Sequence, residues 1–237
     1  MMIRAKFRKA KRLRYISHLQ LLDTLRRAIR RAELPGKYSE GYNPTLNLSL
    51  SQPLPVGMAG GGEYLDLELT AALEPEDFCR RLNDSLPRGI EILQARLTDN
   101  RLKSLQAVVD RARYHLLPPL KDQSREVRDS RAEAVLQEFR NKKEIIVVRK
   151  RRNKSDRSYN LREMVHEIKT AAEGRWSFLV STGSRGNVRP EEIIRGLQQI
   201  DSSIGEQPLI NFYREGLYVS RPPKLLTPLA DEIMEGE

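Results

Sequence analysis

The order and spacing of apolar residues predict an α+β fold built from two tandem ferredoxin-like units, each a split βαβ arrangement with a mainly antiparallel sheet. Short segments alternate apolar and polar residues as half-buried strands do, and longer segments repeat them every three to four residues as amphipathic helices do. These elements follow a similar order in both halves of the 237-residue chain. We expect a first unit, a connector, a second unit and a frayed tail at residues 1–99, 100–111, 112–220 and 221–237.

The first unit is predicted to contain a helix that begins after Ser17, a typical N-cap residue. Leu22, Leu25, Ile29 and Ala32 fall on one side of this helix and form its buried stripe. The glycines at 60–62 are predicted to belong to a long connection rather than a strand. The predicted order is strand, helix, strand, strand, helix, strand, at residues 3–7, 18–32, 46–50, 64–69, 75–85 and 90–97.

The second unit repeats this order with one additional helix. The β-branched run within residues 144–151 predicts a strand. Helical spacing of Leu161, Met164, Val165 and Ile168 predicts the additional helix over residues 159–172. The other predicted elements are a connector helix, a strand, a helix, a strand, a helix and a closing strand pair, at residues 102–109, 113–117, 124–140, 176–181, 190–200 and 209–219.

Charge and composition favour a binding or accessory protein over a self-contained enzyme. The chain has 42 Lys and Arg against 32 Asp and Glu, a formal charge of +10, which attracts nucleic acid or an acidic protein. The alternative is a surface charged for solubility alone. The single cysteine, Cys79, excludes an internal disulfide and a cysteine-based metal site, and we expect no cofactor in this chain. No apolar run is long enough for a membrane span, and the N-terminus lacks a signal-peptide core, so we expect a soluble cytoplasmic protein.

Two groups of basic residues are candidate contacts to nucleic-acid phosphates. Arg26, Arg27, Arg30 and Arg31 crowd two turns of the predicted first helix, and phosphates would relieve their repulsion. A solvated face balanced by nearby acids is the alternative. A second run follows a predicted strand and should form an exposed arm, at Arg149, Lys150, Arg151, Arg152 and Lys154.

Two glycine-containing loops and one turn are weaker candidates. Residues 41–44 and 60–63 could line a site, because glycines permit close approach of a ligand to the backbone. The turn over residues 183–190 carries Arg185 and Arg189 and leads into a predicted helix, where an anion could bind. A simple turn and helix cap is the alternative for this segment.

His18 and Glu63 are the weak candidates for catalytic residues. The nearest carboxylate on the helix of His18 is Asp23, which is badly placed five residues further on. A histidine near a helix start is more often structural than catalytic. Three further polar residues of the same segments, Ser17, Ser39 and Asn43, could serve a site or could be caps and loop fasteners.

Several motifs resemble the radical SAM-linked protein family. They are LRYISHL at 13–19, RRA at 30–32, YSEGYNP at 38–44, PLPVG at 53–57 and EYLD at 63–66. The resemblance covers most of residues 3–219 and is most specific in the first 100. It implies a bacterial cytoplasmic accessory protein that works with a radical SAM partner enzyme, acting on RNA, and it supplies no catalytic residues. Gln20 and Thr45 depart from the family pattern, so any chemistry of those positions in relatives is in doubt here.

We therefore expect an RNA-binding accessory protein. Its arginine-rich helix and its 149–154 arm would contact phosphates, and its loop over residues 39–45 would form part of a groove. A small enzyme with a site at His18 and Glu63 is one alternative. The other is a purely protein-binding subunit, for which an exposed apolar patch would be the sign.

Overall fold

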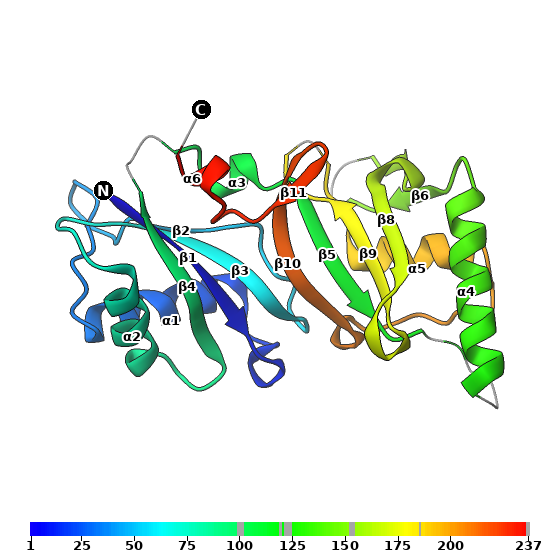
Figure 1. The fold of residues 1–237 in the computed structure, drawn as a ribbon, viewed down its shortest axis with the longest axis horizontal. Coiled ribbons are helices and arrows are strands. Elements are labelled where there is room, and N and C mark those ends of the chain that lie inside the picture. Colours follow the sequence, from blue (N-terminus) through cyan, green and yellow to red (C-terminus); the bar gives the residue numbers. More distant parts are fainter. Residues whose placement is uncertain (99–101, 119, 121–124, 152–154, 185, 236–237) are drawn as a thin grey trace.

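The chain folds into an α+β structure in which strands of both halves join one sheet (Figure 1). This computed structural model describes residues 1–98, 102–118, 120, 125–151, 155–184 and 186–235. Every strand pairing of the main sheet but one is antiparallel. The predicted fold class is therefore confirmed.

The first half has the strand order of a ferredoxin-like unit. Its strands lie in the order β4-β1-β3, and β2 pairs with the other edge of β3. The helices begin where the sequence predicts, because Ser17 caps α1 and a proline opens α2. The elements are β1 (Met2–Lys9), α1 (His18–Arg31), β2 (Leu48–Leu50), β3 (Ala59–Glu68), α2 (Pro75–Ser85) and β4 (Ile90–Thr98).

The second half repeats this arrangement, with the strand order β10-β5-β9-β8. A separate two-stranded hairpin of β6 and β7 is inserted between α4 and β8. The elements are α3 (Leu105–Val108) in the connector, then β5 (Arg111–Leu116), α4 (Arg125–Asn141), β6 (Ile146–Arg149), β7 (Arg157–Asn160), β8 (Val165–Thr170), β9 (Trp176–Ser181), α5 (Pro190–Gln198), β10 (Phe212–Arg221), β11 (Lys224–Leu226) and α6 (Asp231–Met234).

The additional helix predicted over residues 159–172 is wrong. This segment contains the end of β7, a 3₁₀ turn over Arg162–Met164 and strand β8. A bulge lies between Val165 and Glu167, so the buried residues Val165 and Ile168 are three positions apart instead of two. That spacing imitates the period of a helix.

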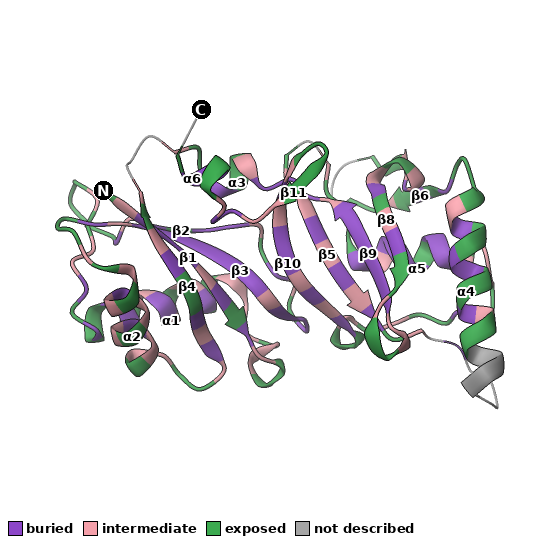
Figure 2. Ribbon diagram, viewed as in Figure 1, coloured by how far each residue is buried: buried purple, intermediate pink, exposed green. Residues whose placement is uncertain are grey.

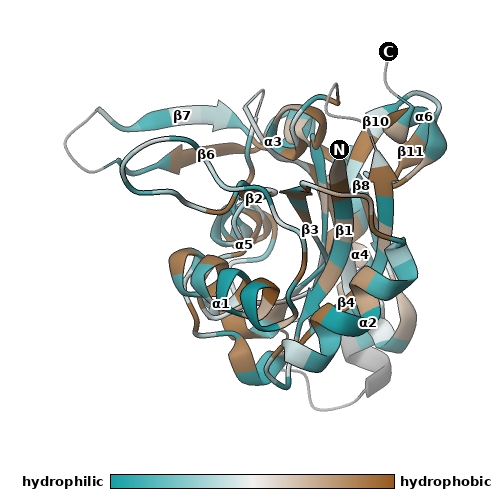
Figure 3. Cartoon of the chain, turned by 90° about the vertical axis from the view of Figure 1, so that its left-hand side faces the viewer, coloured by the Kyte–Doolittle hydropathy of each residue, from teal (hydrophilic) through white to brown (hydrophobic). Residues whose placement is uncertain are grey.

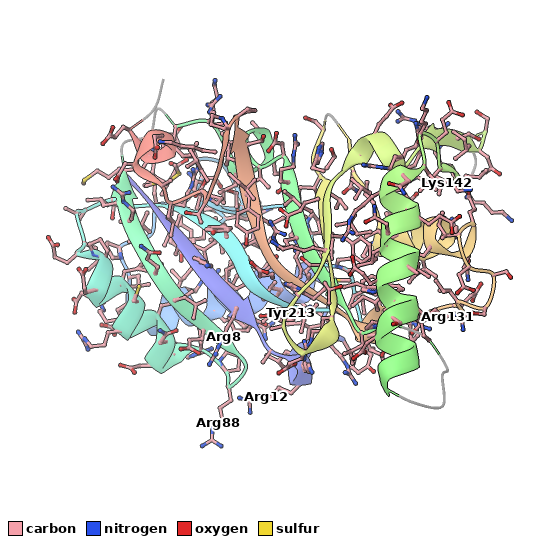
Figure 4. All side chains as sticks on the ribbon, turned by 45° about the vertical axis from the view of Figure 1, so that its right-hand side comes forward. Arg8, Arg12, Arg88, Arg131, Lys142 and Tyr213 are labelled. Carbon is pink, nitrogen blue, oxygen red and sulfur yellow. The ribbon has the colours of Figure 1, made fainter. Side chains whose placement is uncertain are left out.

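The glycine run at 60–62 is a strand, in contrast to the predicted connection. It begins β3 and lies against β10, which pairs with it in parallel at Ala59 and Gly60. A Cβ on Gly61 would collide with the hydroxyl of Tyr213, a residue at the middle of the sheet (Figure 4). The glycines therefore permit close approach of another strand. We call this contact of β3 with β10 the seam.

Two apolar cores lie on either side of the seam, and the central strands are buried along most of their length (Figure 2). The first core packs α1 through Leu21, Leu25 and Ile29 against β1 and β3. The second is centred on aromatic residues that include Trp176 and Phe139. Burying these side chains contributes roughly 1.5–3 kcal/mol each relative to leaving them exposed.

The end of the chain is packed rather than frayed, in contrast to the prediction. Leu229, Ile233 and Met234 are buried. Arg96 on β4 donates a hydrogen bond to the carbonyl of Leu229 at 2.8 Å and pairs with Asp231. Residues 236–237 lie outside the described residues. Within the part of the chain that the structure describes, no helix is both long and apolar enough to span a bilayer.

Candidate nucleic-acid interface and the seam

The arginines of α1 differ in how far the fold neutralises them. Arg26 lies 3.5 Å from the carboxylate of Asp23. Arg31 donates a hydrogen bond to the carbonyl oxygen of Ser85 at 2.6 Å, which ties α1 to α2. Arg27 and Arg30 are exposed, and among the described residues neither side chain has a hydrogen-bonded or ion-paired partner. These two cations are available to an external anion.

A shallow cavity of about 180 Å³ lies between this arginine face and the following loop. Arg26, Arg27 and Arg30 line it from α1 together with Asp23, and Thr45 and Leu46 line it from the following segment. We call this cavity the α1 groove. The structure thus brings together three of the four predicted arginines and one end of the predicted loop.

The loop over residues 39–45 is closed by its own hydrogen bonds. The backbone N–H of Ser39 donates to the carbonyl of Thr45 at 2.8 Å, and the N–H of Thr45 donates to the Ser39 hydroxyl at 3.0 Å. Ser39 therefore fastens the loop, as Ser17 caps α1 by accepting from the N–H of Gln20. Asn43 is exposed at the tip of the loop.

The same loop presents aromatic side chains that the sequence analysis missed. Tyr42 is 99% exposed and Tyr38 is 41% exposed. Exposed aromatic rings provide surfaces on which unpaired bases stack. The signal was present as a tyrosine between Gly41 and Asn43, where no apolar period buries it.

The predicted basic arm is the end of the β6–β7 hairpin, which projects from the sheet on the side where α1 lies (Figure 3). Arg149 is held within the fold. Its Nε donates to Glu192 at 2.6 Å, and its guanidinium lies over the ring of Tyr159 at 5.4 Å. Lys150 and Arg151 are exposed. Arg152 and Lys154 lie outside the described residues.

The turn before α5 provides one exposed cation. Arg189 occupies the N-cap position of α5, and its backbone N–H donates to Glu192 at 2.7 Å while its side chain is exposed. Arg185 lies outside the described residues. Neither the hairpin nor this turn lines the α1 groove.

Glu63 is engaged in a buried ion pair. Both of its carboxylate oxygens accept hydrogen bonds from Arg214 of β10, across the seam. The side chains are only 4% and 1% exposed. Arg214 also donates to the carbonyls of Pro53 at 3.2 Å and Gln52 at 2.8 Å. Burial of an ion pair is tolerated when the remaining donors are satisfied in this way.

His18 lies close to this pair but is not bonded to it. Burial lowers the pKa of His18, as does the charge of Arg214, whereas Glu63 raises it. Among the described residues no hydrogen bond joins His18 to Glu63. Arg214 donates to both carboxylate oxygens of Glu63, so in this structure the carboxylate is paired with that guanidinium and not with His18.

Lys9 adds a further buried cation, one that the sequence analysis missed together with Arg214. Lys9 of β1 pairs with Gly60 of β3, and Gly60 pairs with Arg214 of β10, so the two cations flank one glycine. A Cβ on Gly60 would overlap the Glu63 carboxylate, which occupies the vacant space. The Lys9 ammonium donates to the carbonyl of Arg14 at 3.4 Å. We call Lys9, His18, Glu63 and Arg214 the seam cluster.

Another arginine-lined cavity, of about 340 Å³, lies between the end of β1 and the turn before β4. Arg8, Arg12 and Arg88 line it, and Figure 4 shows these side chains together. Arg8 is paired with Glu91. The basic N-terminal run alone does not predict this cavity, because Arg88 joins the other two arginines only in the fold.

Fold and surface define the class: a tandem ferredoxin-like protein with a basic groove and a polar seam. The chain belongs to the family described as "Uncharacterized protein conserved in bacteria (DUF2344)", whose profile matches residues 2–190. No curated protein sequence matches the chain. A chain in the crystal structure of the archaeal box H/ACA sRNP Nop10-Cbf5 complex is similar, with 13% identity and a TM-score of 0.40. The match covers 92% of this chain and 47% of that one, and at this similarity it carries no inference about function.

Proposed function

We propose that this protein binds RNA in the α1 groove as an accessory to a partner enzyme, without a cofactor of its own. The observation that carries the proposal is that Arg27 and Arg30, which the fold leaves unneutralised, line a groove together with Thr45, and Thr45 ends a fastened loop in which Tyr42 is exposed. Guanidinium groups match phosphate geometry, and the ring offers a stacking surface for a base. This pairing suits a single strand, whose bases are free to stack.

The charge of the whole chain supports the same ligand. With a formal charge of +10, association with a polyanion is favoured at long range and weakens with salt. The exposed hairpin residues Lys150 and Arg151 would extend the contact to the backbone, because they carry no aromatic neighbour for base stacking.

The first test is titration of a fluorescent single-stranded RNA at several salt concentrations. The double variant Arg27→Ala, Arg30→Ala should weaken binding at least tenfold and reduce the slope of log K against log salt by about 1.4, at roughly 0.7 for each phosphate that is no longer neutralised. The matched control, Lys142→Ala with Lys143→Ala, removes the same charge from exposed positions just beyond the end of α4 (Figure 4). An equal effect of both double variants would refute the groove.

The loop is tested separately from the charges. Tyr42→Ala should cost about 1–3 kcal/mol of binding if a base stacks on the ring, with no change in salt slope. Tyr42→Phe should bind as the native protein does. Because Tyr42 is 99% exposed, neither change should alter the stability of the fold.

A specific observation also favours a protein partner. Tyr15, Leu19 and Val56 are large apolar residues with 62%, 70% and 50% exposure. The N–H of Gly57 donates to the carbonyl of Arg14, which places Val56 beside the segment that leads into α1. Exposed apolar patches of this kind mark protein contacts.

The partner that the motifs imply is a radical SAM enzyme, and we propose that the patch of Tyr15, Leu19 and Val56 docks it. Support comes from the resemblance of residues 13–19 and 53–57, which contain the three exposed apolar residues of the patch. Leu19→Asp should abolish co-purification with such an enzyme while leaving RNA titration unchanged. The Leu93→Asp variant, at another exposed apolar residue, is the control. Retained co-purification of Leu19→Asp would exclude the patch.

A further inference from the structure

A second cavity lies where the two units meet. It measures about 240 Å³ and is lined by Gln52, Tyr114, Thr182, Asn187, Arg189 and Arg214, with prolines and backbone between them. Its walls come from the segment before β3, from β5 and β10, and from the turn that begins α5. We call it the seam cavity. It is separate from the α1 groove, with which it shares no lining residue.

The charges at the seam cavity are unbalanced. Among its described lining residues the charged ones are Arg189 and Arg214, and both are cations. Behind Arg214, the seam cluster contains Lys9 and Arg214 against the single carboxylate of Glu63. Burial lowers the pKa of Lys9, and the charge of Arg214 acts in the same direction, whereas the carboxylate of Glu63 acts in the opposite one. A buried positive charge without a matching anion is costly, and an anion in the adjoining cavity would offset that cost.

The cavity wall also contains an unsatisfied acceptor. Gln52 donates through Nε2 to the carbonyl of Val109 at 3.0 Å, which fixes the orientation of its amide. Its Oε1 is buried and has no hydrogen-bond partner among the described residues. Buried acceptors are almost always paired in native proteins. A ligand with a hydroxyl or N–H group beside its anionic group would satisfy this oxygen if the side chain of Gln52 shifted enough to expose it to the cavity.

The mouth of the cavity offers donors for such an anion. The guanidinium of Arg189 is exposed, and no hydrogen bond holds that side chain to another described residue. Asn187 accepts from the hydroxyl of Thr182 through Oδ1 at 3.1 Å, and this leaves its Nδ2 group to donate. Arg214, fixed by Glu63 and two carbonyls, supplies a positive field that cannot move away.

We infer that the seam cavity binds a phosphate monoester that carries hydroxyl or N–H donors, a chemistry offered by a mononucleotide or by the terminal phosphate of an RNA. Arg189 and Asn187 would contact the phosphate oxygens, Arg214 would stabilise their charge, and Gln52 would accept from the sugar or base. This site is formed by different residues from the α1 groove, so the inference does not depend on RNA binding in that groove.

The experiment measures binding by isothermal titration calorimetry with the full chain. The probes are inorganic phosphate, uridine 5′-monophosphate, adenosine 5′-monophosphate and uridine without phosphate. A parallel titration compares one RNA oligonucleotide with a 5′-phosphate, a 3′-phosphate or hydroxyl ends only. Stronger binding of the monophosphates than of uridine, with equal binding of all oligonucleotides, assigns the site to a mononucleotide. At least tenfold tighter binding of one phosphorylated oligonucleotide assigns it to an RNA end. Failure of every phosphate to improve binding overturns the proposal.

Variants test whether the cavity is responsible. Arg189→Gln should weaken binding of the preferred phosphate probe about tenfold, the effect of losing one charge-assisted hydrogen bond. Arg195→Gln removes another exposed cation, one of α5 that lies outside the cavity and donates to the carbonyl of Val148 at 3.0 Å, and should leave phosphate binding unchanged. Both side chains are exposed, and circular dichroism will confirm that the fold is kept. Equal losses in both variants would show diffuse charge attraction and overturn the site.

Failure here is distinguishable from failure of the RNA groove. The double variant Arg27→Ala, Arg30→Ala leaves the seam cavity intact, so it should bind the mononucleotides or inorganic phosphate as the native protein does. If this double variant binds the phosphate probes normally and Arg189→Gln binds them more weakly, the seam-cavity proposal is supported whatever the outcome of the RNA titration. If Arg189→Gln binds phosphate normally, the cavity is refuted while the groove is untouched.

Discussion

The buried pair of Glu63 and Arg214 offers a direct test of how the two units are held together. Glu63→Gln keeps the shape of the side chain and one acceptor oxygen but removes its charge. Arg214 would then lie 1% exposed with no anion in contact, and Lys9 would add a second uncompensated cation. Breaking a buried pair from one side costs about 3–5 kcal/mol. For a chain of this length that corresponds to a fall in Tm of roughly 6–20 °C, at about 2–4 °C per kcal/mol.

The assay is urea denaturation followed by two signals. Fluorescence reports on Trp176, the single tryptophan, which is fully buried in the second core, while circular dichroism reports on both units. Because Glu63 belongs to β3 and Arg214 to β10, the midpoints of both signals should fall together, with the slope of the transition unchanged.

The matched control is Glu232→Gln, which breaks an exposed ion pair with Lys224. Exposed pairs contribute about 0–1 kcal/mol, so this variant should unfold almost as the native protein does. If Glu63→Gln proved no more destabilising than Glu232→Gln, the assignment of the buried pair as the fastening of the seam would be refuted. A shift confined to circular dichroism would show that the pair stabilises only the first unit.

Three further changes follow from contacts described above. Gly61→Ala should destabilise the fold by about 1–3 kcal/mol in urea, because its Cβ overpacks the seam, whereas the same change at Gly205, with open space around it and no positive φ, should be milder. The hydrogen bond from Arg113 holds the pKa of Glu167 at about 2, below its ordinary 4.5. The ionised Glu167 therefore stabilises the fold above pH 4.5, and this stabilisation is lost as the pH falls towards 2. The Glu167→Gln variant should show a flatter dependence of unfolding free energy on pH between 4.5 and 2. Arg149→Ala should lower Tm and leave the salt slope of RNA binding unchanged, since its guanidinium is engaged within the fold; a changed slope with unaltered Tm would contradict this.

The helices of the first unit could be predicted because their signals are local, whereas the start of β3 at the glycine run could not. A capping serine, an apolar stripe and proline or glycine breaks mark the ends of α1 and α2 within a few residues of where they lie. In the second unit, β8 was predicted as a helix because it contains a bulge at residue 166. A one-residue insertion into a strand changes the spacing of its buried residues from two to three. Periodicity cannot separate such a strand from a short helix, and only the pairing with β9 decides between them.

The seam cluster could not be predicted because its partners are distant in sequence. Glu63 and Arg214 are separated by 151 positions, and Lys9 joins them only through the register of three strands. One local signal existed: Arg214 occurs at an inward position in a strand that otherwise alternates, between the buried Phe212 and Leu217. A charged residue at such a position predicts a buried partner without naming it.

The sequence locates basic residues, but their pairing in the fold determines which remain available to a ligand. Arg149 appeared as exposed as its neighbours, yet Glu192 neutralises it. Arg26 and Arg31 are likewise occupied by Asp23 and by a backbone carbonyl, while Arg27 and Arg30 are not. Repulsion between adjacent cations destabilises a helix unless something offsets it. The fold offsets it for one arginine of each neighbouring pair on α1. The two arginines without a partner, Arg27 and Arg30, line the same groove, where an external phosphate would relieve their repulsion.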